Sequence, residues 1–236
     1  MEFIRTYVSG LDEKIEGGIP KGSVILVSGP TGSMKSSFSF YVAYKYLENM
    51  KKGNVIYVSL EQSRESLLNQ MLSLGMDIEK LPKDCEFNVF DWGLVRKIVR
   101  EANRHEEIDW LEAIINPVKE YGASKNIDFL ILDSLNALYA IANLKNPRNQ
   151  LFFLFEAMRD LGATTLVISE TPYNSMKFGT YDVEGFLADS IIHLSMERIG
   201  RTLGRYVSII KIRGVKHSTD YYPLLVDDRG FRIISH

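Results

Sequence analysis

Short apolar runs recur along the first two thirds of the chain, with amphipathic stretches between them. The runs predict buried strands because they are short and rich in β-branched residues, and they cover residues 24–28, 55–60, 87–90, 129–134 and 164–170. The stretches between them place apolar residues at helical spacing and predict helices over 38–51, 63–75, 92–121 and 151–161. Strands that alternate with helices indicate a parallel sheet with right-handed crossovers.

The last third of the chain has a different pattern. Residues 173–185 have no clear period and contain two glycines, which predicts a mobile loop. Beyond it, closely spaced strands are expected at 191–196, 205–213, 221–226 and 231–234, with a turn signal at 227–230. The sheet should therefore finish antiparallel. No repeat or flexible linker divides the chain, so we expect one α/β domain over residues 1–236.

Composition and net charge restrict the classes of protein to which this chain can belong. With 236 residues, 45% of them hydrophobic, the chain can bury a sizeable core. The net charge of −2 argues against a dedicated DNA-binding protein, because nothing in it draws a polyanion to the surface as a whole. Cys85 is the single cysteine, and neither a signal peptide nor an apolar run long enough to cross a bilayer is evident. A cytoplasmic protein with no membrane partner is expected.

The first strand leads into a pattern typical of a phosphate-binding loop. Such a loop reads G-x-x-x-x-G-K-[ST], and here Gly29, Lys35 and Ser36 fit while Met34 occupies the second glycine. Backbone N–H groups and a helix N-terminus would face the phosphates, Lys35 would reach the β and γ phosphates, and the Ser36 hydroxyl would ligate Mg²⁺. The nucleotide-binding residues expected from this motif are Gly29, Pro30, Thr31, Gly32, Ser33, Met34, Lys35, Ser36 and Ser37. The alternative is an ordinary strand-to-helix turn in which Lys35 is merely solvated.

Three later strands end in carboxylates, and ligands of open parallel sheets collect at that edge. Asp133 would help Ser36 to orient Mg²⁺, although a strand-closing Asp is also a common helix cap. Glu61 would take a proton from an attacking water or orient it, with a plain helix-start Glu as the alternative. The pair Ser169 and Glu170 is a candidate γ-phosphate sensor or simply a strand terminus.

Taken together, these motifs resemble a single KaiC domain of the RecA/RadA group of P-loop ATPases. The resemblance runs from the lead-in at 11–22 through the loop and strands above, the segments at 162–165 and 183–189, and the element Lys211-Ile-Arg213-Gly214-Val-Lys-His217. It implies a RecA-like core, ATP and Mg²⁺ as ligands, a regulatory or signalling role, and a homo-oligomeric ring, usually a hexamer, with ATP at each subunit boundary. A further protein partner is compatible with it.

The resemblance also implies residues that act on a neighbouring subunit. Lys211, Arg213 and His217 match positions that reach the adjacent nucleotide, and Arg205 fits a further contact of that kind. An arginine finger supplied across an interface neutralises γ-phosphate charge. Without the resemblance, Lys211 and Arg213 would be interpreted as a solvated strand face.

Departures from the family pattern leave alternatives open. Met34 replaces a glycine, and Gln62 stands where many members carry a second glutamate, which leaves Glu61 as the sole candidate base. The Ser/Thr pair that is autophosphorylated in the second KaiC domain aligns with Gly185 and Phe186, so no autokinase activity is expected there. An ATP hydrolase, an ATP-binding assembly switch with little turnover, and a RadA-like recombination protein are the three hypotheses; the third ranks last because the 173–185 loop carries little positive charge.

Overall fold

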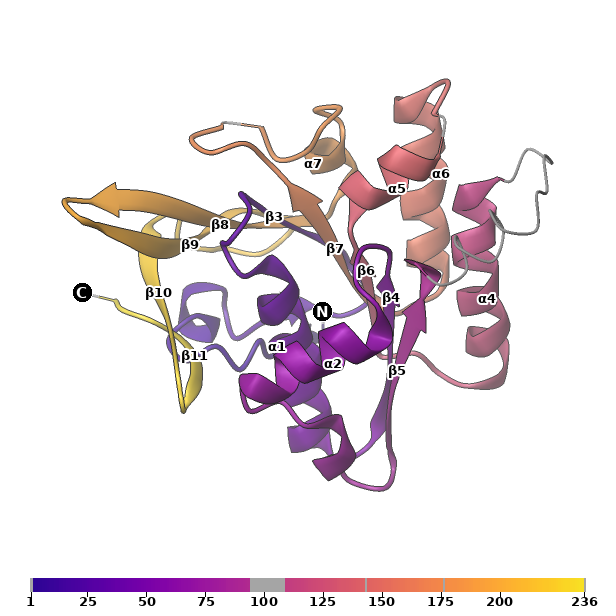
Figure 1. Cartoon of the computed structure of the whole chain (residues 1–236), viewed down its shortest axis with the longest axis horizontal. Coiled ribbons are helices and arrows are strands. Elements are labelled where there is room, and N and C mark those ends of the chain that lie inside the picture. The colour runs from indigo at the N-terminus through magenta and orange to yellow at the C-terminus, as the bar shows by residue number, and fades with distance from the viewer. Residues whose placement is uncertain (1, 94–108, 143, 176, 236) are drawn as a thin grey trace.

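The computed structural model describes residues 2–93, 109–142, 144–175 and 177–235. Within these residues, a nine-stranded sheet has the order β11-β10-β9-β8-β3-β7-β6-β4-β5 (Figure 1). Its strands are β3 (Val24–Gly29), β4 (Gly53–Ser59), β5 (Cys85–Asp91), β6 (Phe129–Asp133), β7 (Thr164–Glu170), β8 (Ser190–Ile199), β9 (Thr202–Ile212), β10 (Tyr221–Asp227) and β11 (Gly230–Ile233). A separate pair joins β1 (Phe3–Ile4) to β2 (Ile19–Pro20). The α/β class with a mainly parallel core and antiparallel C-terminal strands is confirmed.

Helices cover both faces of the sheet (Figure 1). Alternate residues of the central strands enter different cores: Ile25 packs with α1 (Lys35–Met50) and α2 (Arg64–Ser73), whereas Leu26 packs on the other face. That other face is covered by α4 (Trp110–Ser124), α5 (Leu135–Ile141) and α6 (Pro147–Asp160). The period-2 alternation of strand side chains thus builds a three-layer arrangement.

Aromatic contacts hold helix α1 in place on two sides. Phe38 packs edge-on against Phe231 of β11, with ring centroids 5.8 Å apart, and Phe40 stacks on Phe87 of β5 at 4.4 Å. Ten of the sixteen α1 residues are buried. The helix that carries Lys35 at its first turn is therefore fixed between the sheet and the C-terminal strands, and this positions the preceding loop.

Several predictions differ in detail from the structure. Strand β8 pairs parallel with β3 and antiparallel with β9, a junction that the sequence pattern did not specify. Pro147 is the first residue of α6 and not a residue before it, with Asn146 as the cap. Helix α5 was not predicted, and the short α7 (Glu184–Leu187) begins inside the expected loop. Of the helix expected over 92–121, residues 94–108 lie outside the described residues.

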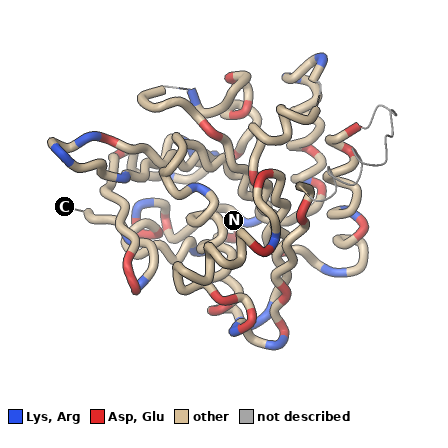
Figure 2. Tube along the Cα trace, viewed as in Figure 1, with Lys and Arg blue, Asp and Glu red and all other residues tan. Residues whose placement is uncertain are grey.

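The parallel pairing brings the expected site to one edge. Strands β3, β4, β6 and β7 run in the same direction, so their carboxyl ends at Gly29, Ser59, Asp133 and Glu170 lie together. Charges of both signs are interspersed over the molecule in the view of Figure 2. This distribution agrees with the small net charge and gives no reason to expect a polyanion-binding face in that view.

Candidate functional site

The loop between β3 and α1 has a glycine-like backbone conformation at Met34, where the phosphate-loop motif carries its second glycine. Met34 has φ +72°, in the left-handed region that favours glycine, and directly precedes α1. Its side chain packs against the α1 core, which helps to offset the strain of this conformation. Gly29 is required for another reason: a Cβ there would lie 2.1 Å from the Leu194 carbonyl oxygen of β8. The replacement of the motif glycine by Met34 therefore adds a side chain beside the loop and leaves the backbone conformation of the loop as the motif requires it.

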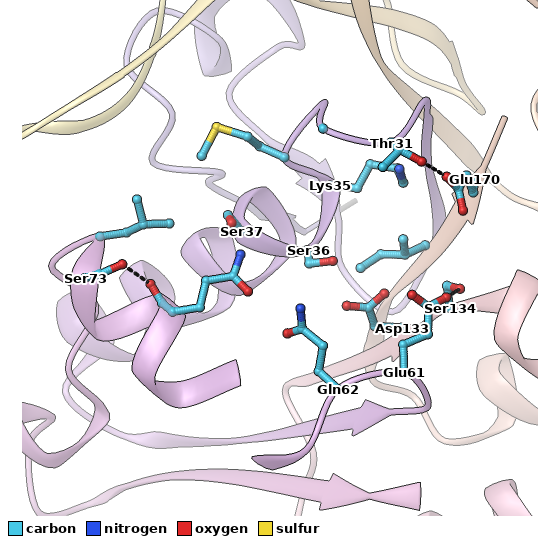
Figure 3. Close-up of a pocket in the computed structure, with 15 residues that line it drawn as sticks. Thr31, Lys35, Ser36, Ser37, Glu61, Gln62, Ser73, Asp133, Ser134 and Glu170 are labelled. Atoms are coloured by element: carbon cyan, nitrogen blue, oxygen red, sulfur yellow. Dashed lines mark hydrogen bonds between the residues drawn. The ribbon is translucent and has the colours of Figure 1, made fainter. Parts of the chain in front are cut away.

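Lys35 lies in the middle of the site (Figure 3). Its Nζ donates a hydrogen bond to the Pro30 carbonyl oxygen at 3.0 Å. Burial lowers the pKa of the Lys35 ammonium, and the nearby carboxylates of Glu170, Asp133 and Glu61 oppose that shift. A half-buried cation with three carboxylates nearby is not the solvated lysine of an ordinary turn.

Asp133 and Ser36 lie together as the motif predicts, and Tyr57 joins them. The Asp133 carboxylate accepts a hydrogen bond from the Tyr57 phenol, and the Ser36 hydroxyl lines the same pocket. Burial raises the pKa of Asp133, and the neighbouring Tyr57 and Ser36 hydroxyls counteract the rise by stabilising the ionised form. Sequence reasoning missed Tyr57; the available signal was a residue with a polar tip inside an otherwise apolar strand.

Glu61 follows β4 and reaches toward the end of β6. Its Oε1 accepts a hydrogen bond from Ser134 Oγ at 2.7 Å, and the same hydroxyl accepts from the Ala137 N–H at 3.3 Å as the cap of α5. Ser134 thus holds both the start of a helix and the candidate base. Gln62 lines the pocket beside Glu61, and its buried Oε1 has no hydrogen-bond partner among the described residues.

Glu170 borders the loop on its other side. Its carboxylate accepts a hydrogen bond from Thr31 (Figure 3), while its backbone N–H donates to Asn136 Oδ1 at 2.7 Å. Tyr173 donates from its hydroxyl to the Thr31 carbonyl oxygen at 2.8 Å. The segment after β7 therefore contacts the phosphate loop directly, a relationship that the sequence pattern did not reveal.

A pocket of about 430 Å³ is lined by the polar side chains of Thr31, Lys35, Ser36, Glu61, Gln62, Asp133, Ser134 and Glu170. It extends from the loop toward α2, where Gln70, Ser73 and Leu74 complete its wall. Oxygen ligands from Ser36 and Asp133 are the kind that Mg²⁺ prefers. No cluster of three or more His, Cys, Asp or Glu side chains suited to a metal occurs in the described part of the chain. The donor set fits a Mg²⁺ ion that takes one or two protein oxygens and completes its shell with phosphates and water.

The residues expected to act between subunits fall in two places. Arg205, near the start of β9, donates from Nε to the Gly32 carbonyl oxygen of its own loop at 3.1 Å. Lys211 lies at the other end of β9 and donates to the carbonyl oxygens of Gly185 and Ala188 at 2.9 and 2.6 Å. Burial lowers the pKa of Lys211, with Arg213 adding to the effect.

Arg213 and His217 lie beyond that end of β9. Arg213 pairs with Asp189 at 3.2 Å and donates to the Phe186 carbonyl oxygen at 2.7 Å, and the His217 ring lies 3.1 Å from the Val215 carbonyl oxygen. Lys211, Arg213 and His217 do not line the pocket around Lys35. Their expected action on a neighbouring nucleotide stays a prediction.

Comparison with known proteins agrees with this geometry. The sequence model of the family described as "ATPase: KaiC" matches residues 4–236. The chain belongs to the KaiC ATPase family. It is similar over its whole length to the crystal structure of the KaiC-like protein PH0186 from Pyrococcus horikoshii, with a TM-score of 0.82, 26% identity and 99% of each chain covered.

Two kinds of relative define where the chain lies within the family. The UPF0273 protein of Thermotoga maritima is 28% identical over 98% of this chain and 95% of its own length. The circadian clock oscillator protein KaiC of Synechococcus elongatus is 26% identical over 98% of this chain, which corresponds to only 44% of that protein. The chain is thus KaiC-like and spans less than half the length of that clock protein. Among the described residues, none of the helices is long and apolar enough to cross a membrane.

Proposed function

We propose that residues 1–236 act as one ATPase domain that binds and hydrolyses Mg-ATP in the pocket around Lys35. The observation that carries this proposal is the convergence of four groups from three segments on one pocket: the Lys35 ammonium, the Ser36 hydroxyl and the carboxylates of Asp133 and Glu61. A cation, an oxygen ligand pair and a candidate base are the parts that phosphoryl transfer to water needs.

Each side chain has a role that its contacts support. Lys35 binds the β and γ phosphates, for which it exchanges its hydrogen bond to Pro30. Ser36 and Asp133 would hold Mg²⁺, which neutralises phosphate charge when bound. Glu61 accepts the proton of the attacking water, and Ser134 keeps its carboxylate in place.

The proposal includes a homo-oligomeric ring, with six subunits expected from the family. Lys211 and Arg213 share one end of β9, away from the pocket of their own chain, and contact the carbonyl groups of residues 185–188. Cations in such a position can serve a neighbour's γ-phosphate without disturbing their own loop. The name of the cyanobacterial relatives, circadian clock oscillator protein, supports a regulatory or signalling role.

A second candidate is an ATP-binding assembly switch with little turnover. It is favoured by the single glutamate at the base position, since Gln62 cannot accept a proton. A DNA-recombination role has weaker support, because Lys177 of the 173–185 loop already lies 3.7 Å from Asp182. Turnover per subunit measured in the wild type, alongside particle mass with and without Mg-ATP, distinguishes the hydrolase from the switch.

The phosphate-loop assignment itself is tested by Lys35→Ala. Loss of the ammonium removes a charge-assisted contact to phosphate, so isothermal titration with a non-hydrolysable ATP analogue should detect no binding. Lys52→Ala is the matched control, because Lys52 is exposed just beyond α1 and outside the pocket. Unchanged affinity in Lys35→Ala would overturn the assignment.

A further inference from the structure

A buried phenol lies directly beneath the proposed magnesium ligands. Tyr57 of β4 has none of its surface exposed, and it donates a hydrogen bond to Asp133 Oδ2. Strand register explains the contact: Tyr57 pairs with Ile131 of β6, so Asp133 is its diagonal neighbour on the same face of the sheet. The hydroxyl therefore joins β4 to the carboxylate at the end of β6.

We infer that Tyr57 is a positioning residue for the divalent cation, which it fixes through Asp133. This inference rests on the proposed function. The Asp133 carboxylate cannot rotate away without breaking its bond to the phenol, and a fully buried hydroxyl left without a partner is costly. The phenol ring packs against Phe40 of α1, with centroids 5.9 Å apart, in the core between the sheet and that helix. The carboxylate of Asp133 thus meets the cation already oriented, which lowers the cost of binding.

The position of Tyr57 separates this role from simple core packing. Other tyrosine–carboxylate hydrogen bonds in the described residues, such as Tyr46 to Asp128 at 3.1 Å, involve carboxylates that do not line the pocket. Tyr46 is also buried and also belongs to the core around α1. A role in stability alone predicts similar consequences for the two phenols, whereas a positioning role predicts a change in cation binding for Tyr57 only.

The test compares Tyr57→Phe with Tyr46→Phe in the full chain. Each variant keeps its ring and loses one hydroxyl. Thermal unfolding in the presence of ADP, titrated with MgCl₂, gives the Mg²⁺ concentration for half-maximal stabilisation, and calorimetry with EDTA gives metal-free ADP affinity. For Tyr57→Phe we expect a rise of about tenfold in that Mg²⁺ concentration, the scale of one hydrogen bond to a charged group, with metal-free ADP affinity unchanged. For Tyr46→Phe both quantities should match the wild type.

A third variant, Asp133→Asn, distinguishes a loss of cation positioning from a folding defect. Tyr57→Phe leaves Asp133 Oδ2 without its donor, and Asp133→Asn removes the charge that makes this costly. Adding Tyr57→Phe to Asp133→Asn should leave the Mg²⁺ response of the single Asp133→Asn variant unchanged. The inference is overturned if Tyr57→Phe responds to Mg²⁺ as the wild type does, or if it weakens the response equally when Asp133 is absent. A wild-type protein that binds ADP with no response to Mg²⁺ would instead overturn the metal assignment, and the inference with it.

Discussion

Ser134 donates a hydrogen bond to Glu61 at 2.7 Å and so joins the segments that follow two neighbouring strands, β4 and β6. The bond gives the candidate base a fixed orientation at the edge of the pocket. Two predictions concern this pair.

The first concerns Glu61 itself. Glu61→Gln keeps the shape of the side chain and an oxygen for Ser134, but the amide cannot take a proton from water. ATP hydrolysis should fall by about 100-fold or more while ATP affinity is retained. Phosphate release under single-turnover conditions and calorimetric titration measure the two quantities. Glu65→Gln, on the exposed first turn of α2, is the control. Full turnover in Glu61→Gln would show that Glu61 has no catalytic role and only precedes a helix.

The second prediction distinguishes two functions of Ser134, the capping of α5 and the orientation of Glu61. Ser134 and Ser63 both cap a helix, α5 and α2 respectively, through a side chain that accepts a backbone N–H. Replacement of either by Ala should lower the free energy of unfolding by about 1 kcal/mol. Only Ser134→Ala should also lower kcat, because only Ser134 bonds Glu61. Equal kcat in the two variants, measured well below their unfolding temperatures, would limit Ser134 to capping.

A third prediction concerns the departure at Met34. Since Met34 has φ +72°, glycine adopts this conformation without strain, whereas alanine keeps the Cβ that makes it costly. Met34→Gly should therefore bind ATP several times more tightly than Met34→Ala, because the loop reaches its binding conformation at lower cost. Calorimetry on both variants measures the difference. Equal affinities would mean that the backbone at this position does not limit binding.

The sequence predicted the parts of the fold that depend on local pattern. Strands β3, β4, β6 and β7 are short apolar runs, and because both of their faces are buried they can pack only in the interior of the sheet. The partner of β8 could not be predicted in this way, because an apolar run does not specify its neighbour. The crossover to β8 contains only the four-residue α7, which is too short to show a helical period.

The same distinction holds for the site. Lys35 and Ser36 were predicted from a motif with fixed spacing, and Asp133 from its place at the end of a later apolar strand. The contacts of Tyr57 with Asp133 and of Ser134 with Glu61 link segments more than 70 residues apart, and they depend on strand register. A shift of one residue in that register would turn each strand side chain to the other face, and the pattern of a single chain does not determine it.

The final prediction tests whether sites are completed between subunits. Lys211 and Arg213 hold the segment around α7 and lie away from the pocket of their own chain, so Arg213→Ala should lower turnover while its own Lys35 stays intact. An arginine finger can contribute 10³-fold or more to the rate. Circular dichroism should show a folded protein, because Arg213 is largely exposed and its bond to Asp189 is a surface ion pair.

Mixing provides the sharper measurement. Lys35→Ala subunits retain the finger and Arg213→Ala subunits retain the phosphate loop, so in a randomly mixed ring about a quarter of the interfaces have both. Turnover should then rise well above that of either variant alone, toward about a quarter of the wild-type value. Native mass spectrometry of subunits that carry tags of different mass establishes co-assembly. Mixed rings with no recovered activity would show that Arg213 does not serve a neighbour's nucleotide, because every other requirement of the site is met at those interfaces.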